Sequence, residues 1–208
     1  MSRRFVAATK KQVDEWLGRD LSQLDLAVLM IDGIVIADHV MLVALGIDSD
    51  GKKHVLGVRE GATENAVACT ALLTDLRDRG LRTDRAVLVV IGGGKALARA
   101  VRNVFGARAI VQRCQAHKSR NVTDQLPDEM RPSVRQAMRD AYATSDAERA
   151  RTMLANLARR LRDEHPGAAA SLDEGLDETL SVKRLKLPRV WHGDDGVGDQ
   201  NGMWSSTR

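Results

Sequence analysis

The fold is decided by residues 26–33, which read LAVLMIDG. The first six residues are apolar without a break, as in a strand that is buried on both faces of a sheet. Two further strands are predicted at residues 40–47 and 54–58, and the turn cluster DSDG at residues 48–51 separates them. Because the connections are short, the three strands are predicted to form an antiparallel meander.

Beyond this meander the chain alternates between helices and strands. Thr63 is a candidate N-cap for a helix that Gly80 ends. Residues 86–91, AVLVVI, form another fully apolar strand, and a further helix separates them from a brief fifth strand at residues 109–111. This order predicts an α/β fold with a five-stranded mixed sheet, antiparallel first and parallel later.

All signals after Cys114 are helical. Residues 145–148, SDAE, match a capping box that opens one helix, and another helix is predicted over residues 168–186. Residues 131–188 are therefore predicted to form an all-helical sub-domain. Residues 189–208 show no period and are predicted to be an unstructured tail.

The composition is that of a globular chain. Of 208 residues, 43% are hydrophobic and 29% are charged, which argues against disorder, collagen and a membrane bundle. The apolar runs are strand-sized, and the residues after Met1 form no signal-peptide core. Two cysteines are too few for a disulfide framework. These features predict a cytoplasmic protein without a membrane partner.

The charge distribution favours a polyanionic partner. The formal net charge is +4, and the first twelve residues carry four basic side chains and no acidic one. Residues 113–162 hold 11 Lys and Arg against 6 Asp and Glu, a local net charge of +5. Two basic regions on either side of a more neutral middle fit a nucleic acid, although each alone fits a solvated helical surface equally well.

Asp32 is the most informative polar residue. It follows a strand that is apolar on both faces, so its carboxylate is expected at a sheet edge beside a bound ligand. The alternative is a turn residue in the pair Asp32–Gly33. The sequence pattern alone leaves both open.

Residues 92–95, GGGK, lie between a strand and a helix and invite comparison with a phosphate-binding loop. That loop needs a glycine separated by four residues from its Gly-Lys pair and a hydroxyl residue after that pair. This chain has Val89 and Ala96 at those places. The pattern therefore disfavours a nucleotide-binding loop.

Cys114 and His117 are spaced three residues apart, as in half of a zinc site. The second half is missing, because Cys69 and His54 follow no such pattern. A Cys–His nucleophile pair also fits the spacing, but no orienting acid is evident. The motif is more often structural than catalytic.

Several segments together resemble the Mutator-type transposases of bacterial insertion sequences. The most specific is QRCQAHK at residues 112–118, which matches the Gln-Arg-Cys-x-x-His motif of that family. The others are residues 31–33, 43–48, 51–57 and 59–65. The resemblance runs from about residue 2 to residue 188.

The resemblance implies a domain organisation. It places a basic lead-in at residues 1–24, an RNase H-like catalytic core at residues 25–125 and an incomplete helical insertion at residues 126–188. The tail at residues 189–208 looks like translation in another reading frame. The chain is therefore expected to be a truncated copy.

The resemblance also implies a chemistry. Three carboxylates would hold two Mg²⁺ (or Mn²⁺) ions that act on a phosphodiester of DNA. Asp32 matches the first carboxylate and is the expected catalytic and metal residue. Residues of the 112–118 motif are expected to be structural or to lie near DNA: Arg113, Cys114, His117 and Lys118.

Two of the three carboxylates are missing here. The second follows the fourth strand in the family, where this chain has Gly92, and Asp84 lies at the wrong end of that strand. The third is a Glu in an Asn-Pro-x-Glu-Asn motif, which these 208 residues do not contain. The metal ions are therefore expected to bind poorly.

Two functions remain open at this point. One is an insertion-sequence transposase that binds the ends of the element and transfers DNA strands. The other is a non-catalytic remnant that binds DNA, forms a homo-oligomer or associates with an intact transposase. The family resemblance favours the first function, and the missing carboxylates favour the second.

Overall fold

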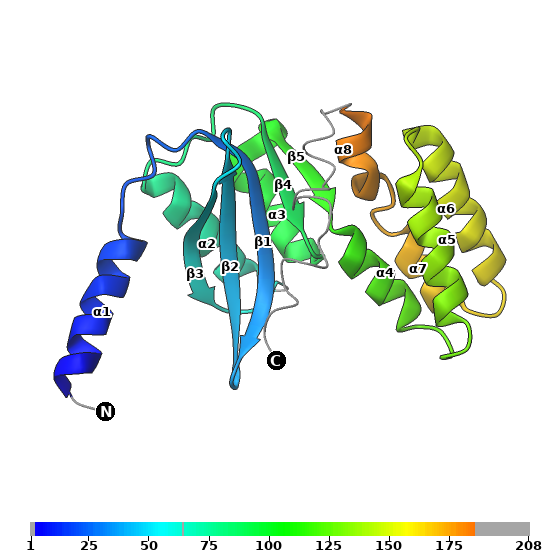
Figure 1. The fold of residues 1–208 in the computed structure, drawn as a ribbon, viewed down its shortest axis with the longest axis horizontal. Helices are drawn as coiled ribbons and strands as arrows, with labels where there is room; N and C mark the ends of the chain where they lie inside the picture. Colours follow the sequence, from blue (N-terminus) through cyan, green and yellow to red (C-terminus); the bar gives the residue numbers. More distant parts are fainter. Residues whose placement is uncertain (1–2, 64, 186–208) are drawn as a thin grey trace. The chain divides into compact units, whose positions relative to one another are not determined.

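The computed structural model describes residues 3–63 and 65–185. The chain divides into two compact units between Ile110 and Val111, and Figure 1 labels the elements of both. Among the described residues, no helix has both the length and the apolar character needed to cross a membrane. The predicted unstructured, out-of-frame tail at residues 189–208 lies outside the described residues.

The first unit holds most of the sheet. Its elements are α1 (Arg3–Leu17), β1 (Leu26–Ile36), β2 (His39–Asp48), β3 (Lys53–Glu60), α2 (Ala66–Asp78), β4 (Val87–Ile91), α3 (Lys95–Phe105) and η1 (Gly106–Arg108). The short strand β5 (Ala109–Arg113) follows.

The sheet has five strands in the order β3-β2-β1-β4-β5. Strand β1 pairs antiparallel with β2, β2 pairs antiparallel with β3, and β1 pairs parallel with β4. The predicted α/β fold with a mixed five-stranded sheet is confirmed.

Helices α2 and α3 cover one face of this sheet (Figure 1). Leu72 and Leu73 of α2 and Leu97 and Val101 of α3 are almost fully buried. Gly57 of β3 allows the close approach of α2, because a Cβ atom at residue 57 would lie only 3.1 Å from a methyl carbon of Leu72. The face is therefore packed by aliphatic side chains.

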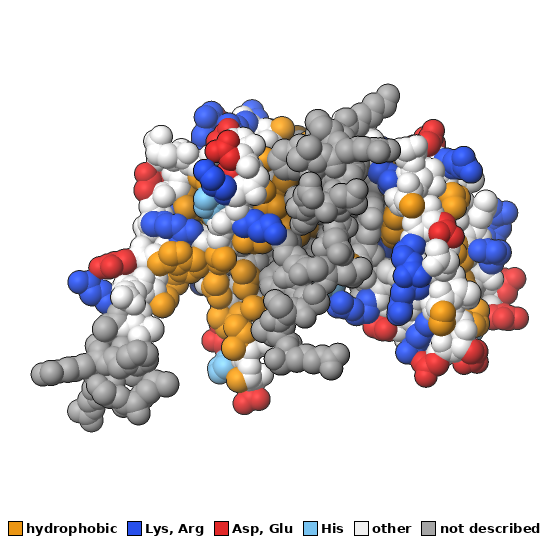
Figure 2. All heavy atoms as spheres, in the orientation of Figure 1, with side chains coloured by type: hydrophobic (Ala, Val, Ile, Leu, Met, Phe, Trp, Pro, Cys, Tyr) orange, Lys and Arg blue, Asp and Glu red, His pale blue; other side chains and the backbone are white. Residues whose placement is uncertain are grey.

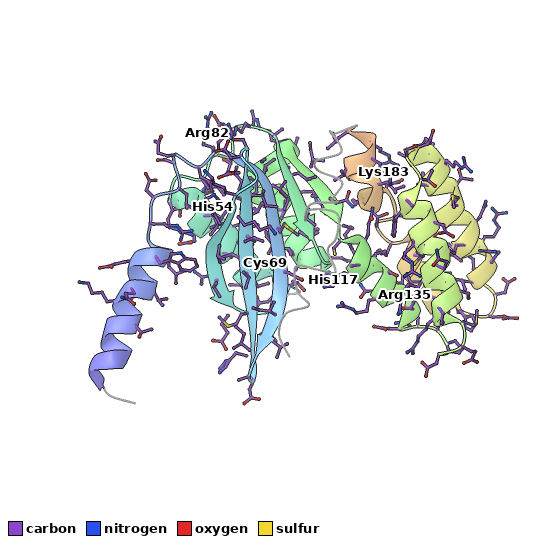
Figure 3. The ribbon with its side chains drawn as sticks, in the orientation of Figure 1. His54, Cys69, Arg82, His117, Arg135 and Lys183 are labelled. Carbon is purple, nitrogen blue, oxygen red and sulfur yellow. The ribbon has the colours of Figure 1, made fainter. Side chains whose placement is uncertain are left out.

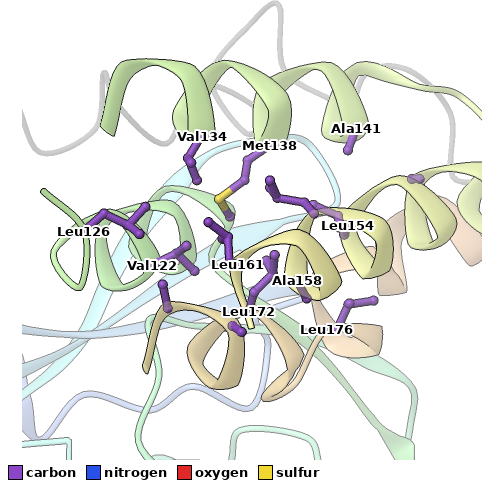
Figure 4. Packing of buried hydrophobic residues seen from close by; sticks show 14 of the residues in the cluster. Val122, Leu126, Val134, Met138, Ala141, Leu154, Ala158, Leu161, Leu172 and Leu176 are labelled. Atoms are coloured by element: carbon purple, nitrogen blue, oxygen red, sulfur yellow. The ribbon is translucent and has the colours of Figure 1, made fainter. Parts of the chain in front are cut away.

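The second unit is helical. It contains α4 (Gln115–Thr123), α5 (Arg131–Ala143), α6 (Ala147–Leu161), α7 (Pro166–Asp173), η2 (Asp177–Leu180) and α8 (Ser181–Arg184). Figure 4 shows its core, in which Val122, Met138 and Leu154 of three different helices are fully buried. Residues 131–185 contain no strand, as predicted.

The segment predicted as a basic lead-in contains α1. Four local predictions need correction. The helix predicted over residues 168–186 is broken into three short elements, because Gly175 has a positive φ of 63° that ends the helical path. Strand β1 continues to Ile36, so Asp32 and Gly33 lie inside the strand and form no turn.

Both predicted N-caps are also displaced. Asn65, and not Thr63, caps α2, since its side-chain oxygen accepts hydrogen bonds from the backbone N–H groups of Val67 and Ala68. Asp146, and not Ser145, caps α6 by accepting from the N–H of Arg149 at 2.8 Å. In each case the residue that caps is the one whose side chain reaches the free N–H groups of the first turn.

Candidate functional site

Asp32 lies at the point where β1 continues past the end of its parallel neighbour, β4. On one side Asp32 pairs with Val43 of β2. On the other side the pairing with β4 stops one residue earlier, at Ile31 and Ile91. Asp32 is half-buried, and one carboxylate oxygen accepts a hydrogen bond of 2.9 Å from the backbone N–H of Gly33. Its carboxylate therefore lies at the edge of the sheet where β4 ends.

Gly92 occupies the matching position on β4. It directly follows Ile91, which pairs with Ile31, the residue directly before Asp32. Neighbouring strands of a sheet lie about 4.8 Å apart, so residue 92, just past the end of β4, lies beside residue 32, where β1 continues. Strands β1 and β4 are parallel and adjacent. Gly92 brings no side chain to this edge.

Thr63, in the loop between β3 and α2, packs against the same edge of the sheet. The sequence pattern did not reveal this contact. A Cβ atom at residue 33 would lie 3.6 Å from the Thr63 methyl carbon, and one at residue 94 would lie 2.9 Å from the Thr63 carbonyl oxygen. The buried thiol of Cys69, labelled in Figure 3, donates to that same carbonyl oxygen at 3.4 Å. Glycines at both 33 and 94 were the available signal, because they allow a loop to approach closely.

Gly94 also explains why residues 92–95 form a tight turn. Its φ is +81°, a conformation that favours glycine, and it occupies the N-cap position of α3 without a side-chain hydrogen bond. Lys95 is the first residue of α3. The turn therefore serves to begin the helix beside Thr63.

The carboxylates at this edge do not fit a pair of divalent ions. Within residues 3–63 and 65–185, no three His, Cys, Asp or Glu side chains are grouped so as to hold a metal ion. Asp84 precedes β4 and forms an ion pair of 3.0 Å with Arg82, whose hydrogen bond lowers the pKa of that carboxyl. Asp32 is the carboxylate that β1 and β4 bring to this edge.

The 112–118 motif lies in the second unit, at the start of α4. Cys114 is buried and takes the N-cap position of α4, and His117 lies within the first turn. The two side chains are therefore one helical turn apart, as their spacing predicts. Figure 3 labels His117 on this helix.

The two glutamines of the motif are tied to the segment after α7. Gln112 is buried; its amide nitrogen donates to the carbonyl oxygen of Thr179 at 2.8 Å, and its amide oxygen accepts from the N–H of Val182 at 3.0 Å. Gln115 also donates to the Thr179 carbonyl oxygen, at 3.0 Å. The two glutamines thus form hydrogen bonds with backbone groups of the short elements η2 and α8.

Lys118 is the most deeply buried charged residue of the motif, with 0% of its surface exposed. Its ammonium group donates to the carbonyl oxygen of Ser171 at 2.6 Å and to that of Glu174. Burial, and secondarily the nearby Arg113, lower the pKa of Lys118 to about 8. These two carbonyl groups lie at the end of α7, so Lys118 acts as a C-terminal cap for that helix.

Arg113 completes this buried polar cluster. It is 7% exposed, and its guanidinium lies 3.9 Å from the carboxylate of Glu174. Tyr142 packs against the core of the same unit, and burial raises the pKa of its hydroxyl to about 12. The motif is therefore surrounded by groups that hold α4, α7 and η2 together.

In the first unit, His54 contacts the turn between β2 and β3. His54 lies 2.7 Å from the carboxylate of Asp48, which also accepts from the backbone N–H groups of Asp50 and Lys52. These contacts, the side-chain hydrogen bond of His54 above all, lower the pKa of Asp48. His54 therefore holds the hairpin between β2 and β3, and Figure 3 labels it there.

Residues 2–192 match the family model described as "Transposase, Mutator family". The chain is 31% identical over 195 residues to the transposase for insertion sequence element IS6120 of Mycolicibacterium smegmatis, which covers 91% of this chain and 59% of that protein. It is 29% identical over 194 residues to the transposase for IS256 in transposon Tn4001 of Staphylococcus aureus, which covers 86% and 49%. A relative from Rhizobium meliloti, the transposase for ISRM5, is 30% identical over 200 residues. The chain spans about half the length of the curated relatives it matches.

Proposed function

Because the chain belongs to the Mutator family of transposases, we propose that it binds the DNA of an insertion sequence and does not cleave or join the strands. The relatives, all named as transposases for insertion sequence elements, support the DNA partner. The antiparallel meander β1–β3 and the parallel pair of β1 and β4 support an RNase H-like core. On this proposal the helical second unit is the insertion that interrupts the core.

The main observation in support of the proposed loss of DNA cleavage is that Gly92 lies beside Asp32. Two-ion phosphodiester chemistry requires carboxylates that hold both ions a few ångströms apart. Asp32 supplies one carboxylate, and Gly92 supplies none at the position that the resemblance assigns to the second. We therefore propose that Mg²⁺ or Mn²⁺ binds weakly, since Mg²⁺ is normally held by more than one carboxylate or by substrate phosphates.

For the 112–118 motif we propose a structural role. Gln112, Gln115 and Lys118 donate to backbone carbonyl groups between residues 171 and 179. Burying a charged lysine is costly unless its donors find acceptors, and the two carbonyl groups at the end of α7 accept from two of the three N–H donors of Lys118. The motif on this view positions α4 against α7, and Cys114 and His117 share that framework.

Strand nicking tests the loss of cleavage. A labelled duplex that carries the ends of the element encoding this chain is incubated with the protein and Mg²⁺ or Mn²⁺, and 3′-end nicking is scored on a denaturing gel. We expect none. The transposase for IS6120, incubated with the ends of its own element, is the positive control for the assay.

The matched variant is Asp32→Asn, which removes the one carboxylate and keeps the size of the side chain. Metal-dependent nicking by the unmodified chain that disappears in Asp32→Asn would overturn the proposal. Nicking that survives in Asp32→Asn would identify a contaminating nuclease and would leave the expected result, no activity of this chain, in place.

We also propose that the protein associates with a second copy or with an intact transposase in the cytoplasm, where bacterial DNA lies. Val35 and Ile36, at the end of β1 past its last pair with β4, are 74% and 54% exposed, which supports an apolar contact there. Sedimentation of the unmodified chain against Val35→Lys tests it. A sedimentation coefficient that is equal and monomeric for both argues against self-association.

A further inference from the structure

Helix α5 carries three arginines at four-residue spacing, Arg131, Arg135 and Arg139, which we call the arginine stripe. Residues four apart in a helix lie on one side of it, and a rise of 1.5 Å per residue makes the stripe about 12 Å long. Val134 and Met138 point into the core of the helical unit, as Figure 4 shows. The packing of α5 therefore fixes the direction in which the stripe faces.

Arg135 and Arg139, the two arginines of the stripe that lie further from the start of α5, are exposed and make contacts with neutral groups. Arg135 donates to the hydroxyl of Thr123 at 3.4 Å, and Arg139 donates to the amide oxygen of Gln136 at 2.5 Å. Within the described part of the chain, neither forms an ion pair with a carboxylate. Arg131, by contrast, lies 2.7 Å from Asp128. Among the described residues, the positive charges of Arg135 and Arg139 are thus not neutralised by an ion pair.

Three other arginines of the helical unit are ion-paired: Arg151 with Asp177, Arg162 with Asp173 and Arg184 with Asp177. Arg159 donates to the amide oxygen of Asn156. Arg159 and Arg160 lie in the last turn of α6, where a positive charge interacts favourably with the helix dipole. Because those two are consecutive, they point about 100° apart and form no stripe.

Acidic side chains near the stripe are few. Asp140 follows Arg139 on α5, and its carboxylate accepts a hydrogen bond of 2.7 Å from Gln136. Asp124 ends α4, next to Thr123. Figure 2 shows Lys and Arg side chains gathered over part of α5, and Figure 3 labels Arg135.

We propose that the arginine stripe of α5 contacts the phosphate backbone of a DNA duplex. This inference rests on the proposed function, which supplies DNA as the polyanion. A duplex carries one negative charge per about 1.7 Å of its axis when both strands are counted, so about seven phosphates of the two strands together lie within a length equal to that of the stripe. Guanidinium groups suit phosphate because they donate two parallel hydrogen bonds.

The contact is independent of base sequence. Arginine held on a rigid helix with no aromatic neighbour in α5 except the half-buried Tyr142 has no platform on which bases would stack. Phosphate contacts position a protein on the duplex without reading its sequence. The stripe is therefore expected to bind the ends of the element and unrelated duplexes equally.

Fluorescence anisotropy with a labelled 30-base-pair duplex tests the stripe. The unmodified chain, Arg135→Gln/Arg139→Gln and the control Arg159→Gln/Arg160→Gln are titrated across a series of salt concentrations, without divalent metal. Loss of two phosphate contacts lowers the slope of log affinity against log salt by about 2 and weakens binding about tenfold. The control carries the same change in net charge and is expected to follow the unmodified chain closely.

Three results would overturn the inference. The stripe variant binds with unchanged affinity and slope, or the control loses as much, or polyglutamate of equal charge displaces the unmodified chain as well as unlabelled duplex does. If the stripe variant binds duplex as tightly as the unmodified chain does, the DNA binding proposed above stands and only the role of the stripe is contradicted. If the unmodified chain does not bind duplex even at low salt, the DNA-binding part of the proposed function falls with it.

Discussion

Asp32 lies within β1 and Gly92 lies beside it, directly after β4, so the side chain at residue 92 decides how many carboxylates reach this edge. We expect Gly92→Asp to tighten Mn²⁺ binding by about tenfold or more, because a second carboxylate adds a ligand and a negative charge. Gly92 does not have a positive φ, so the backbone admits aspartate there. Isothermal titration with Mn²⁺ measures the change.

The neighbouring glycine provides the matched control for this prediction. Gly93→Asp adds the same charge one residue further on, and we expect it to leave Mn²⁺ affinity close to that of the unmodified chain. Equal tightening by both variants would show a general charge effect and would contradict the pairing of residues 32 and 92. Gly94 is unsuitable, because its φ of +81° and the nearby Thr63 leave no room for a side chain.

Lys118 makes the stability of the helical unit depend on pH. Its pKa is about 8 in the folded chain, against 10.5 for an ordinary lysine. Between these pH values the unfolded chain binds more protons, so the free energy of unfolding rises with pH across this window, by at most about 3 kcal/mol. Below about pH 8 both states hold the proton, and Lys118 contributes no further slope.

Removing the titrating group removes this rise. Urea unfolding of Lys118→Met between pH 7 and pH 10 is expected to show a flatter dependence on pH than the unmodified chain. The exposed Lys53→Met variant is expected to keep the rise. Parallel curves for the unmodified chain and Lys118→Met would show that the ammonium group of Lys118 is not desolvated.

Among the helices, α6 shows how a cap is chosen. Ser145 and Asp146 are both exposed and both of a type that caps helices, but only Asp146 accepts from the free N–H of Arg149. We expect Asp146→Ala to lower the free energy of unfolding by about 1 kcal/mol. Ser145→Ala is expected to change it by less than about 0.5 kcal/mol. Urea denaturation followed by circular dichroism distinguishes the two, and a larger loss for Ser145→Ala would assign the cap to Ser145.

At the scale of the molecule, the two units have separate interiors. Met138 is fully buried in the helical core, and Leu97 is fully buried beneath the sheet. We expect Met138→Ala to cost about 2–5 kcal/mol, with loss of hydrogen-exchange protection confined to residues 111–185. Leu97→Ala is expected to affect residues 26–105 instead. Uniform loss of protection across the chain in either variant would indicate a single cooperative unit.

The elements best predicted from sequence were those with long, uniform patterns. The unbroken apolar runs at residues 26–31 and 86–91 identified β1 and β4, because a run of that length and composition is typical of a strand buried on both faces. The order of strands and helices around them was enough to predict a mixed sheet. Cap and break positions were predicted less well, since Thr63 and Asn65, or Ser145 and Asp146, are chemically equivalent until the backbone places one of them.

By itself, then, the sequence determined the α/β class of the first unit, the helical character of the second, the family and the absence of a carboxylate at residue 92. Only the tertiary structure decided that Asp32 lies within β1, that Thr63 packs beside Gly33 and Gly94, and that Lys118 is buried. The reason is the range of the interactions involved. Apolar periodicity is a local property of the chain, whereas the carbonyl groups that hold Lys118 belong to residues 53 and 56 positions away and meet it only when the helices pack.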